Sequence, residues 1–236
     1  MKVQYLQKDD KKVTFVVKDA DYTVANAIRK AIMTYVPSMA IDRVTVYENT
    51  SPIYEEIIAQ RLGLVPLATD LKTYTLKSEC KCGGKGCARC EANFILEKSG
   101  PGVVYSGDMK PQDSKVKPVY DNMPITKLGN NQKVKMEMAA RLGFMTEHAK
   151  FQCALASYKQ KDDGEFEFFA ESYNNLSAKD IVDIAMENLE AKVEELEDAF
   201  ANAKHKRKSA DEKKEEELPK EEKVIEDLEK KAAKKK

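Results

Sequence analysis

The chain has 236 residues, of which 40 are basic and 40 are acidic, so its formal net charge is zero. A chain of this length can bury a sizeable core in one or two domains, and a balanced charge creates no global field that attracts nucleic acid or anionic membrane. No apolar run approaches the roughly 18 residues that span a bilayer, and the first residues contain no hydrophobic signal region. We therefore expect a cytoplasmic protein without a membrane segment.

The first part of the chain predicts two strands followed by a helix. Val13, Phe15 and Val17 share one face of the second strand. From Thr23 onward, apolar residues recur at helical spacing until Pro37 ends the segment. The aspartates just before this helix fit a turn and helix-cap role better than a metal site, because no further carboxylates follow at ligand spacing.

The stretch 41–67 joins a further strand to a second helix. Ser51 is a suitable cap for this helix, and Pro52 suits the first helical position because its missing N–H would be unpaired there. Gly63 ends the predicted helix and leaves Arg61 available near its end.

The remainder alternates short strands with turns before a last, long helix, which gives an α+β fold. The strand periodicity recurs in seven places, at 74–76, 93–96, 103–105, 116–120, 134–138, 151–156 and 165–169. Asp163 and Gly164 predict a hairpin turn between the last two of these strands. Ser177 caps the long helix, with Asp180 as its capping-box partner.

The long helix carries an apolar seam that persists for about five turns. Its members are Val182, Ala185, Leu189, Val193, Leu196 and Phe200. A compact domain rarely needs so long a seam, so we expect the helix to pack on another chain as well; the alternative is a surface helix lying on its own sheet. Residues 204–236 are nearly all Lys, Glu and Ala and predict a charged, partly helical tail.

Four of the five cysteines form a cluster in a glycine-rich loop: Cys80, Cys82, Cys87 and Cys90. In a reducing compartment such a cluster indicates a metal site rather than disulfides, and four thiolates suit tetrahedral zinc. Because protein fills all four positions, the zinc would be structural. An iron–sulfur cluster is the alternative, although the spacing matches neither usual ferredoxin pattern. Cys153 stands alone and is interpreted as a small buried apolar side chain.

No pattern in the sequence predicts catalysis by this chain itself. The two histidines, His148 and His205, are far apart, and no nucleophile motif or glycine-rich phosphate loop is present. No acidic cluster resembles a two-metal site for nucleotidyl transfer. The chain is therefore expected to act as a scaffold.

Three motifs and the long C-terminal helix together resemble the D-type, alpha-like subunits of archaeal RNA polymerase. The motifs read DYTVANAIRKAI, IYEEIIAQRLGLVPL and AARLGFMTEHAKF. This family corresponds to the third-largest subunit of eukaryotic polymerase II and to the bacterial alpha N-terminal domain. The resemblance covers about residues 1–200 in the family's order.

The resemblance implies a discontinuous alpha-like dimerisation domain with an inserted, mostly β domain. The corresponding limits are 1–47 and 126–203 for dimerisation, 48–125 for the insertion with the cysteine loop, and 204–236 for the tail. The family pattern implies pairing with the small, alpha-like L-type subunit. The expected interface residues are Val24, Ile28, Ala31, Ile32, Val182, Ala185, Leu189, Val193 and Leu196.

The resemblance further implies an assembly platform for the second-largest and largest polymerase subunits, with the small subunits N and P joining. DNA-directed nucleotidyl transfer would belong to the large subunits, and DNA would be met only through the complex. Arg61, Gly63, Leu64 and 147–150 match motifs that look like large-subunit surfaces. The eukaryotic counterpart carries a zinc loop in the inserted domain, which favours zinc over iron–sulfur here.

Two other functions stay open on the sequence alone. A zinc-ribbon nucleic-acid-binding protein would need a basic, aromatic face near the cysteines, where the sequence offers only Lys81, Lys85 and Arg89. A redox protein would use the cysteines for an iron–sulfur cluster, which visible absorption would reveal.

Overall fold

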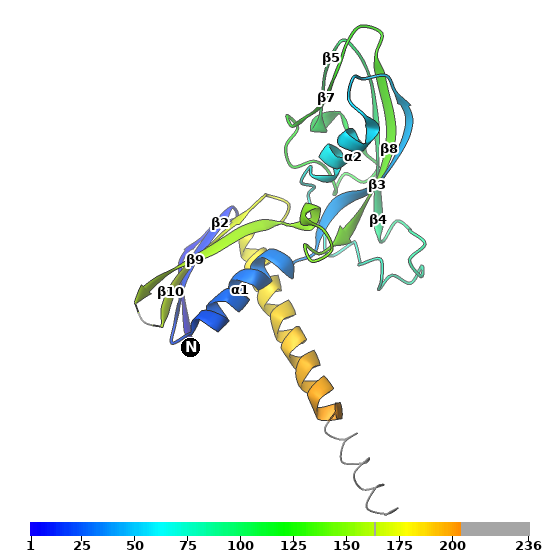
Figure 1. Ribbon diagram of the computed structural model, residues 1–236. Helices are drawn as coiled ribbons and strands as arrows, with labels where there is room; N and C mark the ends of the chain where they lie inside the picture. The colour runs from blue at the N-terminus through cyan, green and yellow to red at the C-terminus, as the bar shows by residue number, and fades with distance from the viewer. Residues whose placement is uncertain (163, 204–236) are drawn as a thin grey trace, which may run out of the picture. The chain divides into compact units, whose positions relative to one another are not determined.

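A computed structural model describes residues 1–162 and 164–203 (Figure 1). Residues 1–189 form one compact unit, and the chain from Glu190 onward forms a second, which is described separately. The predicted charged tail, Asp163 of the predicted hairpin turn and His205 lie outside the described residues.

The first sheet of the compact unit joins the N-terminal strands to residues 154–172. It is antiparallel, and its order is β1 (Lys2–Lys8), β2 (Lys12–Lys18), β10 (Glu165–Ser172) and β9 (Ala154–Asp162). The predicted inward face of β2 is confirmed, since Val13, Phe15 and Val17 are at most 4% exposed. Phe15 stacks on Phe168 of β10, with ring centroids 4.9 Å apart.

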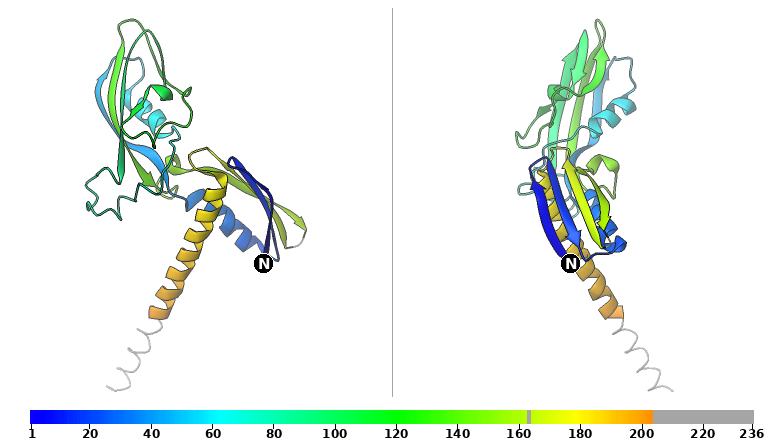
Figure 2. Two further views of the ribbon diagram at one scale, coloured as in Figure 1. Left: turned by 180° about the vertical axis from the view of Figure 1, so that it is seen from behind. Right: turned by 90° about the vertical axis from the view of Figure 1, so that its left-hand side faces the viewer.

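Helix α1 (Tyr22–Thr34) covers one face of this sheet and packs against β9 (Figures 1 and 2). The predicted cap is confirmed, because the Asp21 carboxylate accepts a hydrogen bond from the Val24 N–H at 2.8 Å.

The buried positions of β9 do not follow a simple alternation. Phe151, Cys153 and Leu155 occupy alternate positions in the sequence, but Leu155 is 43% exposed. Ala154 and Ala156 are buried in its place. Small side chains line the strand that faces α1, and they allow the close approach of the helix.

The second sheet comes from the middle of the sequence, and its order is β3 (Ser38–Asn49), β8 (Lys133–Gly143), β4 (Glu91–Ser99) and β6 (Lys110–Pro111). A separate pair is formed by β5 (Gly102–Tyr105) and β7 (Pro124–Leu128). Helix α2 (Glu55–Gly63) buries Ile58 and Leu62 against this part. Two short 3-10 turns, η1 (Ser106–Asp108) and η2 (Ala149–Phe151), complete the set.

The buried apolar side chains form two clusters that divide the sequence. One takes its members from 39–142, and the other from 13–36 together with 153–185. The chain thus passes from one cluster to the other twice, before Met39 and after Leu142. The domain limits expected at 47/48 and 125/126 lie inside the first of these ranges, within or next to β3 and β7.

Several expected elements differ in the structure for identifiable reasons. Helix α2 begins at Glu55 rather than after Ser51, because the Asn49 side chain accepts hydrogen bonds from the N–H and the hydroxyl of Ser51 and holds a turn. No strand forms at 74–76, where Tyr74 is buried and its hydroxyl donates to Asp113 at 2.7 Å. Residues 116–120 contribute only one isolated bridge, and Phe151 lies in η2, before β9 begins.

The last described element is a helix over residues 178–203. Its predicted cap is confirmed, since the Ser177 hydroxyl accepts from the Asp180 N–H at 3.1 Å. Up to Leu189 it belongs to the compact unit, and Ala178, Ile181, Val182 and Ala185 are buried in the cluster that includes α1. None of the described helices is long and apolar enough to span a membrane.

Candidate metal centre and partner surface

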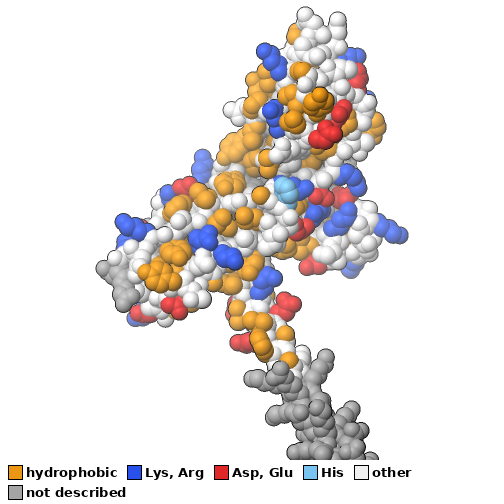
Figure 3. Space-filling view, in the orientation of Figure 1, with side chains coloured by type: hydrophobic (Ala, Val, Ile, Leu, Met, Phe, Trp, Pro, Cys, Tyr) orange, Lys and Arg blue, Asp and Glu red, His pale blue; other side chains and the backbone are white. Residues whose placement is uncertain are grey.

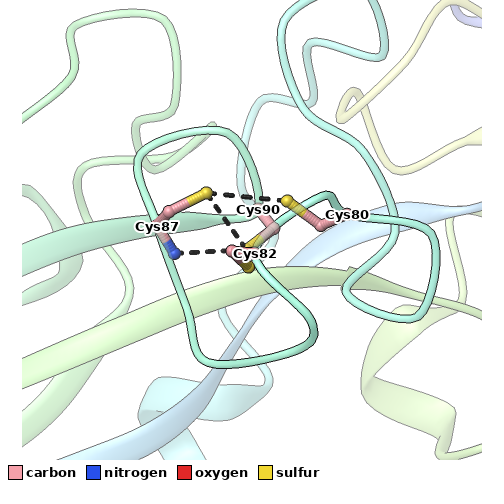
Figure 4. Close-up of side chains that lie close together, drawn as sticks. All are labelled: Cys80, Cys82, Cys87 and Cys90. Atoms are coloured by element: carbon pink, nitrogen blue, oxygen red, sulfur yellow. Dashed lines mark hydrogen bonds between the residues drawn. The ribbon is translucent and has the colours of Figure 1, made fainter.

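The four clustered cysteines lie in the loop that leads into β4, and Cys90 immediately precedes that strand. Their side chains point toward one another from opposite sides of the loop (Figure 4). All four sulfur atoms lie within 4.8 Å of one another. Folding therefore brings together the four ligands that the spacing predicted.

The sulfur separations fit a single tetrahedral ion. The Sγ–Sγ distances are 3.6 Å for Cys80 and Cys87, 3.7 Å for Cys82 and Cys90, and 3.8 Å for Cys87 and Cys90. A zinc ion with Zn–S bonds of about 2.3 Å requires edges of roughly 3.8 Å in a regular tetrahedron. A disulfide needs sulfurs about 2.05 Å apart. All five cysteines are free thiols, so the donor set suits a metal rather than disulfides.

The backbone of the loop explains its glycines. Gly83, Gly84 and Gly86 all have positive φ angles, of 63°, 78° and 93°. A Cβ on Gly86 would also collide with the Glu91 carboxylate. These positions let the chain fold back so that two pairs of thiols face each other.

The thiols differ in environment. Hydrogen bonding from Cys80 and from the Gly86 N–H lowers the pKa of Cys82 to about 6, whereas burial raises the pKa of Cys90 to about 12. Lys81, Lys85 and Arg89 are exposed around the loop. They are placed to offset the negative charge that four thiolates would leave on a divalent ion.

Cys153 lies apart from this centre. It is fully buried in the other apolar cluster, and burial raises its pKa to about 12. An inert, protonated thiol in a core agrees with its interpretation as a small apolar side chain.

The expected partner residues fall into two groups. Ile28, Ala31 and Ile32 of α1, with Val182 and Ala185, are buried within this chain's own core. Val24 and Leu189 are partly buried against the same core. By contrast, Val193, Leu196 and Phe200 are 49%, 56% and 62% exposed. Apolar side chains lie among charged ones along this helix (Figure 3). The seam is thus buried in its first half and exposed in its second half.

The motif at 147–150 belongs to an ion-pair network that sequence reasoning missed. Arg141 of β8 donates to Asp42 at 2.8 Å and to Glu147 at 3.0 Å, and Lys150 reaches Asp42 at 2.7 Å. Burial alone would raise the pKa of Asp42, but the hydrogen bonds from Arg141 and Lys150 outweigh it and lower that pKa to about 2. The Phe151 ring lies against both cations, 5.0 and 5.1 Å away. This network holds the motif in place.

Arg61 also has a partner inside the chain. Its guanidinium donates to the carbonyl of Ile125 at 2.7 Å, so it ties α2 to β7. Leu64, next to the end of α2, is 51% exposed.

Comparison with known proteins finds similarity to the alpha-like subunits of RNA polymerase. Residues 44–157 match the family model of the RNA polymerase Rpb3/RpoA insert domain. The match covers the second half of β3, all of β4 and β8, and the cysteine loop. It begins inside the range of the cluster at 39–142 and ends within β9, which belongs to the other cluster.

The chain is also similar to individual archaeal RNA polymerase subunits. The chain is 43% identical over 150 residues to a DNA-directed RNA polymerase subunit Rpo3 of Archaeoglobus fulgidus, with 64% of this chain and 57% of the relative covered. Rpo3 subunits of Methanosphaera stadtmanae and Methanosarcina acetivorans are 42% and 41% identical over 157 residues, with 58% and 59% of each relative covered. The chain is a homologue of archaeal Rpo3, which confirms the resemblance found in the sequence. The aligned part spans less than three fifths of each of these relatives.

Proposed function

We propose that this chain is a noncatalytic, alpha-like subunit of a DNA-directed RNA polymerase. It pairs with a small L-type subunit in the cytoplasm and forms the platform for the second-largest and largest subunits, with N and P joining. The Rpo3 relatives support membership in such a complex. Nucleotidyl transfer and DNA contact are then properties of the assembled enzyme.

The observation that carries the proposal is the exposed half of the helical seam. Val193, Leu196 and Phe200 continue the spacing of Val182 and Ala185, which are buried. Apolar side chains that stay exposed to water do not stabilise a helix, so this stripe supports the proposal that a partner chain covers it. From the compact unit, α1 would contribute its less buried residues, such as Val24.

The cysteine loop is proposed to hold one structural zinc through Cys80, Cys82, Cys87 and Cys90. A zinc ion bound there would cross-link the loop, and it would offer no catalytic position because the four thiolates would fill its coordination.

The test is co-purification of the tagged full chain from its native cell. Recovery of a small alpha-like chain together with the two large polymerase subunits is expected. Val193→Glu with Leu196→Glu should abolish recovery of the small chain, because charges replace the apolar seam. Ala191→Glu is the matched control, since residue 191 lies on the opposite side of the helix at 100° per residue. Unchanged recovery with the double variant would refute the seam as the interface.

A zinc-ribbon nucleic-acid-binding protein is the second candidate, supported by the exposed Lys81, Lys85 and Arg89. It predicts salt-dependent binding of DNA by the isolated chain, lost when all three residues are replaced by Ala. Recovery of the chain with nucleic acid and without polymerase subunits would favour it.

A further inference from the structure

An ion pair joins the two arms of the cysteine loop. The entering arm carries Lys77, and the leaving arm ends at Glu91, directly after Cys90. Nζ of Lys77 lies 2.9 Å from Oε1 of Glu91, whose side chain is 14% exposed. The backbone also ties the arms together, since the Thr75 N–H donates to the Arg89 carbonyl at 2.9 Å. The ion pair therefore closes the base of the loop that carries the four thiols.

The same carboxylate fixes the loop to the sheet. Glu91 is the first residue of β4, and its Oε2 lies 3.5 Å from a guanidinium nitrogen of Arg43 on β3. The Arg43 side chain is 64% exposed and that of Lys77 is 31% exposed, so solvent weakens the contact with Arg43 more. One carboxylate thus connects both arms of the loop with the sheet.

The carboxylate also sets the position of one turn within the loop. It lies against Gly86, where a Cβ would collide with Oε2 of Glu91. Gly86 has a φ angle of 93°, and its N–H donates to the Cys82 thiol. The carboxylate therefore packs on the residue whose N–H approaches a metal ligand. Groups that orient the ligands of a metal in this way change its affinity by about 10–100-fold when they are mutated.

Simple electrostatics would give Glu91 the opposite effect. Four thiolates on a divalent ion leave a charge of about minus two, so a nearby carboxylate repels the centre. Removal of that carboxylate should then make the ion more tightly held. A positioning role predicts that the ion is held less tightly, and this difference in sign makes the role testable.

We propose that Glu91 is a positioning residue of the metal centre: it joins the two arms of the cysteine loop, holds Gly86 against Cys82, and thereby slows the loss of the ion. The four thiols supply a full tetrahedral set, so Glu91 acts through them and not as a ligand. The inference rests on the zinc centre of the proposed function and does not depend on pairing with polymerase subunits.

The rate of zinc release from the zinc-loaded full chain tests this role. Excess 4-(2-pyridylazo)resorcinol captures the released ion and reports it by absorbance. Glu91→Gln should speed release about tenfold or more. Glu79→Gln is the matched control, because the exposed Glu79 directly precedes Cys80 as Glu91 directly follows Cys90. The control should release zinc at the wild-type rate, and unchanged or slower release from Glu91→Gln overturns the proposal.

A double variant tests whether the ion pair is the cause. Lys77→Met should speed release to a similar extent as Glu91→Gln. The chain with both substitutions should release zinc no faster than the faster single variant, because both remove the same interaction. Effects that multiply would show that the two residues act independently, which overturns the role of the pair.

Two glycines of the loop check the contact with Glu91 independently. Gly83 and Gly86 both have positive φ angles, but a Cβ on Gly83 meets no atom of the described residues within 4 Å. Gly86→Ala should therefore speed release more than Gly83→Ala, and the excess should vanish in the Glu91→Ala background. Equal release from the two single variants would show that the contact does not position the loop.

A comparison with a core variant separates positioning from general stability. Val134 is buried on β8 opposite Lys98, at the other end of β4 from Glu91. Val134→Ala should lower the denaturant midpoint of the zinc-loaded chain more than Glu91→Gln does, yet it should keep the wild-type rate of release. Release from Val134→Ala as fast as from Glu91→Gln would mean that zinc loss follows global unfolding, and the proposal would be wrong.

The outcomes distinguish the two proposals. A wild-type chain that holds no zinc refutes the proposed metal centre. A wild-type chain that holds zinc, with equal release from Glu91→Gln, refutes the role of Glu91 alone.

Discussion

Nζ of Lys150 lies 2.7 Å from Oδ1 of Asp42, so a residue of the 3-10 turn η2 is fixed to the middle of strand β3. Arg141 holds the second carboxylate oxygen of Asp42 at 2.8 Å. One carboxylate thus joins β3, β8 and η2 at the point where the chain leaves the cluster of residues 39–142. The network fixes Lys150 and the 3-10 turn η2 against the two strands.

Asp42→Asn should destabilise the chain at neutral pH. The folded state lowers the pKa of Asp42 to about 2, so its ionised form is stabilised by folding. That contribution is fully present above the unfolded pKa of about 3.9 and is lost as pH falls toward 2. Since the side chain is 35% exposed, solvent screening reduces the effect to the order of 1 kcal/mol.

Unfolding in urea at pH 7 and at pH 2.5 measures this difference. The difference in unfolding free energy between wild type and Asp42→Asn should be smaller at the lower pH. Glu48→Gln, at an exposed position on the same strand, should change stability little at either pH. A gap that stays constant with pH would show that the ion pairs do not stabilise the fold.

Metal content tests the cysteine centre. The full chain should carry about one zinc per chain and should be colourless, because the sulfur geometry fits one tetrahedral ion. Cys82→Ser should lose the metal, whereas Cys153→Ala should keep it, since Cys153 lies in the other apolar cluster. Elemental analysis and visible spectra report both results. Brown protein containing iron would instead support an iron–sulfur cluster.

Gly143→Ala should destabilise the chain by about 1–3 kcal/mol. A Cβ at this position would lie 2.6 Å from the Phe151 ring, and Phe151 is 1% exposed. The ring has little room to move because Arg141 and Lys150 lie against it. Gly63→Ala is the control: its nearest contact is at 3.5 Å, and alanine favours the helix. Equal denaturation midpoints for the two variants would contradict the predicted clash.

Phe168→Ala should cost about 3–5 kcal/mol, because the ring is fully buried and stacked on Phe15. Leu155→Ala on the neighbouring strand should change stability by no more than about 0.5 kcal/mol, because that side chain points outward. Denaturant unfolding compares the two. A large loss from Leu155→Ala would place that side chain in a core.

The local sequence correctly predicted those features that depend on residues close together in the chain. The face of β2 with Val13 and Phe15 and the cap at Ser177 follow from short-range patterns. The cysteine spacing similarly anticipated which thiols meet.

Other features depend on contacts that a local pattern does not contain. Ser51 is a suitable helix cap by residue type, but its N–H and its hydroxyl both donate to the Asn49 side chain and form a turn instead. Asp42 and Arg141 are 99 positions apart, so the local sequence around either residue does not predict that they pair. Ala185 and Val193 occupy equivalent seam positions, and the period alone does not tell where packing within the chain ends.

The division of the apolar side chains has a consequence for synthesis of the chain. The cluster at 39–142 is continuous in sequence and can fold as soon as its own residues have been made. Strand β2 instead pairs with β10, where Val13 lies opposite Ala170 and Phe15 opposite Phe168. The inner face of the β1–β2 hairpin therefore stays without its partner strand until β10 has been synthesised. We expect this hairpin to be the segment most exposed to aggregation on the ribosome and most dependent on protection by other proteins.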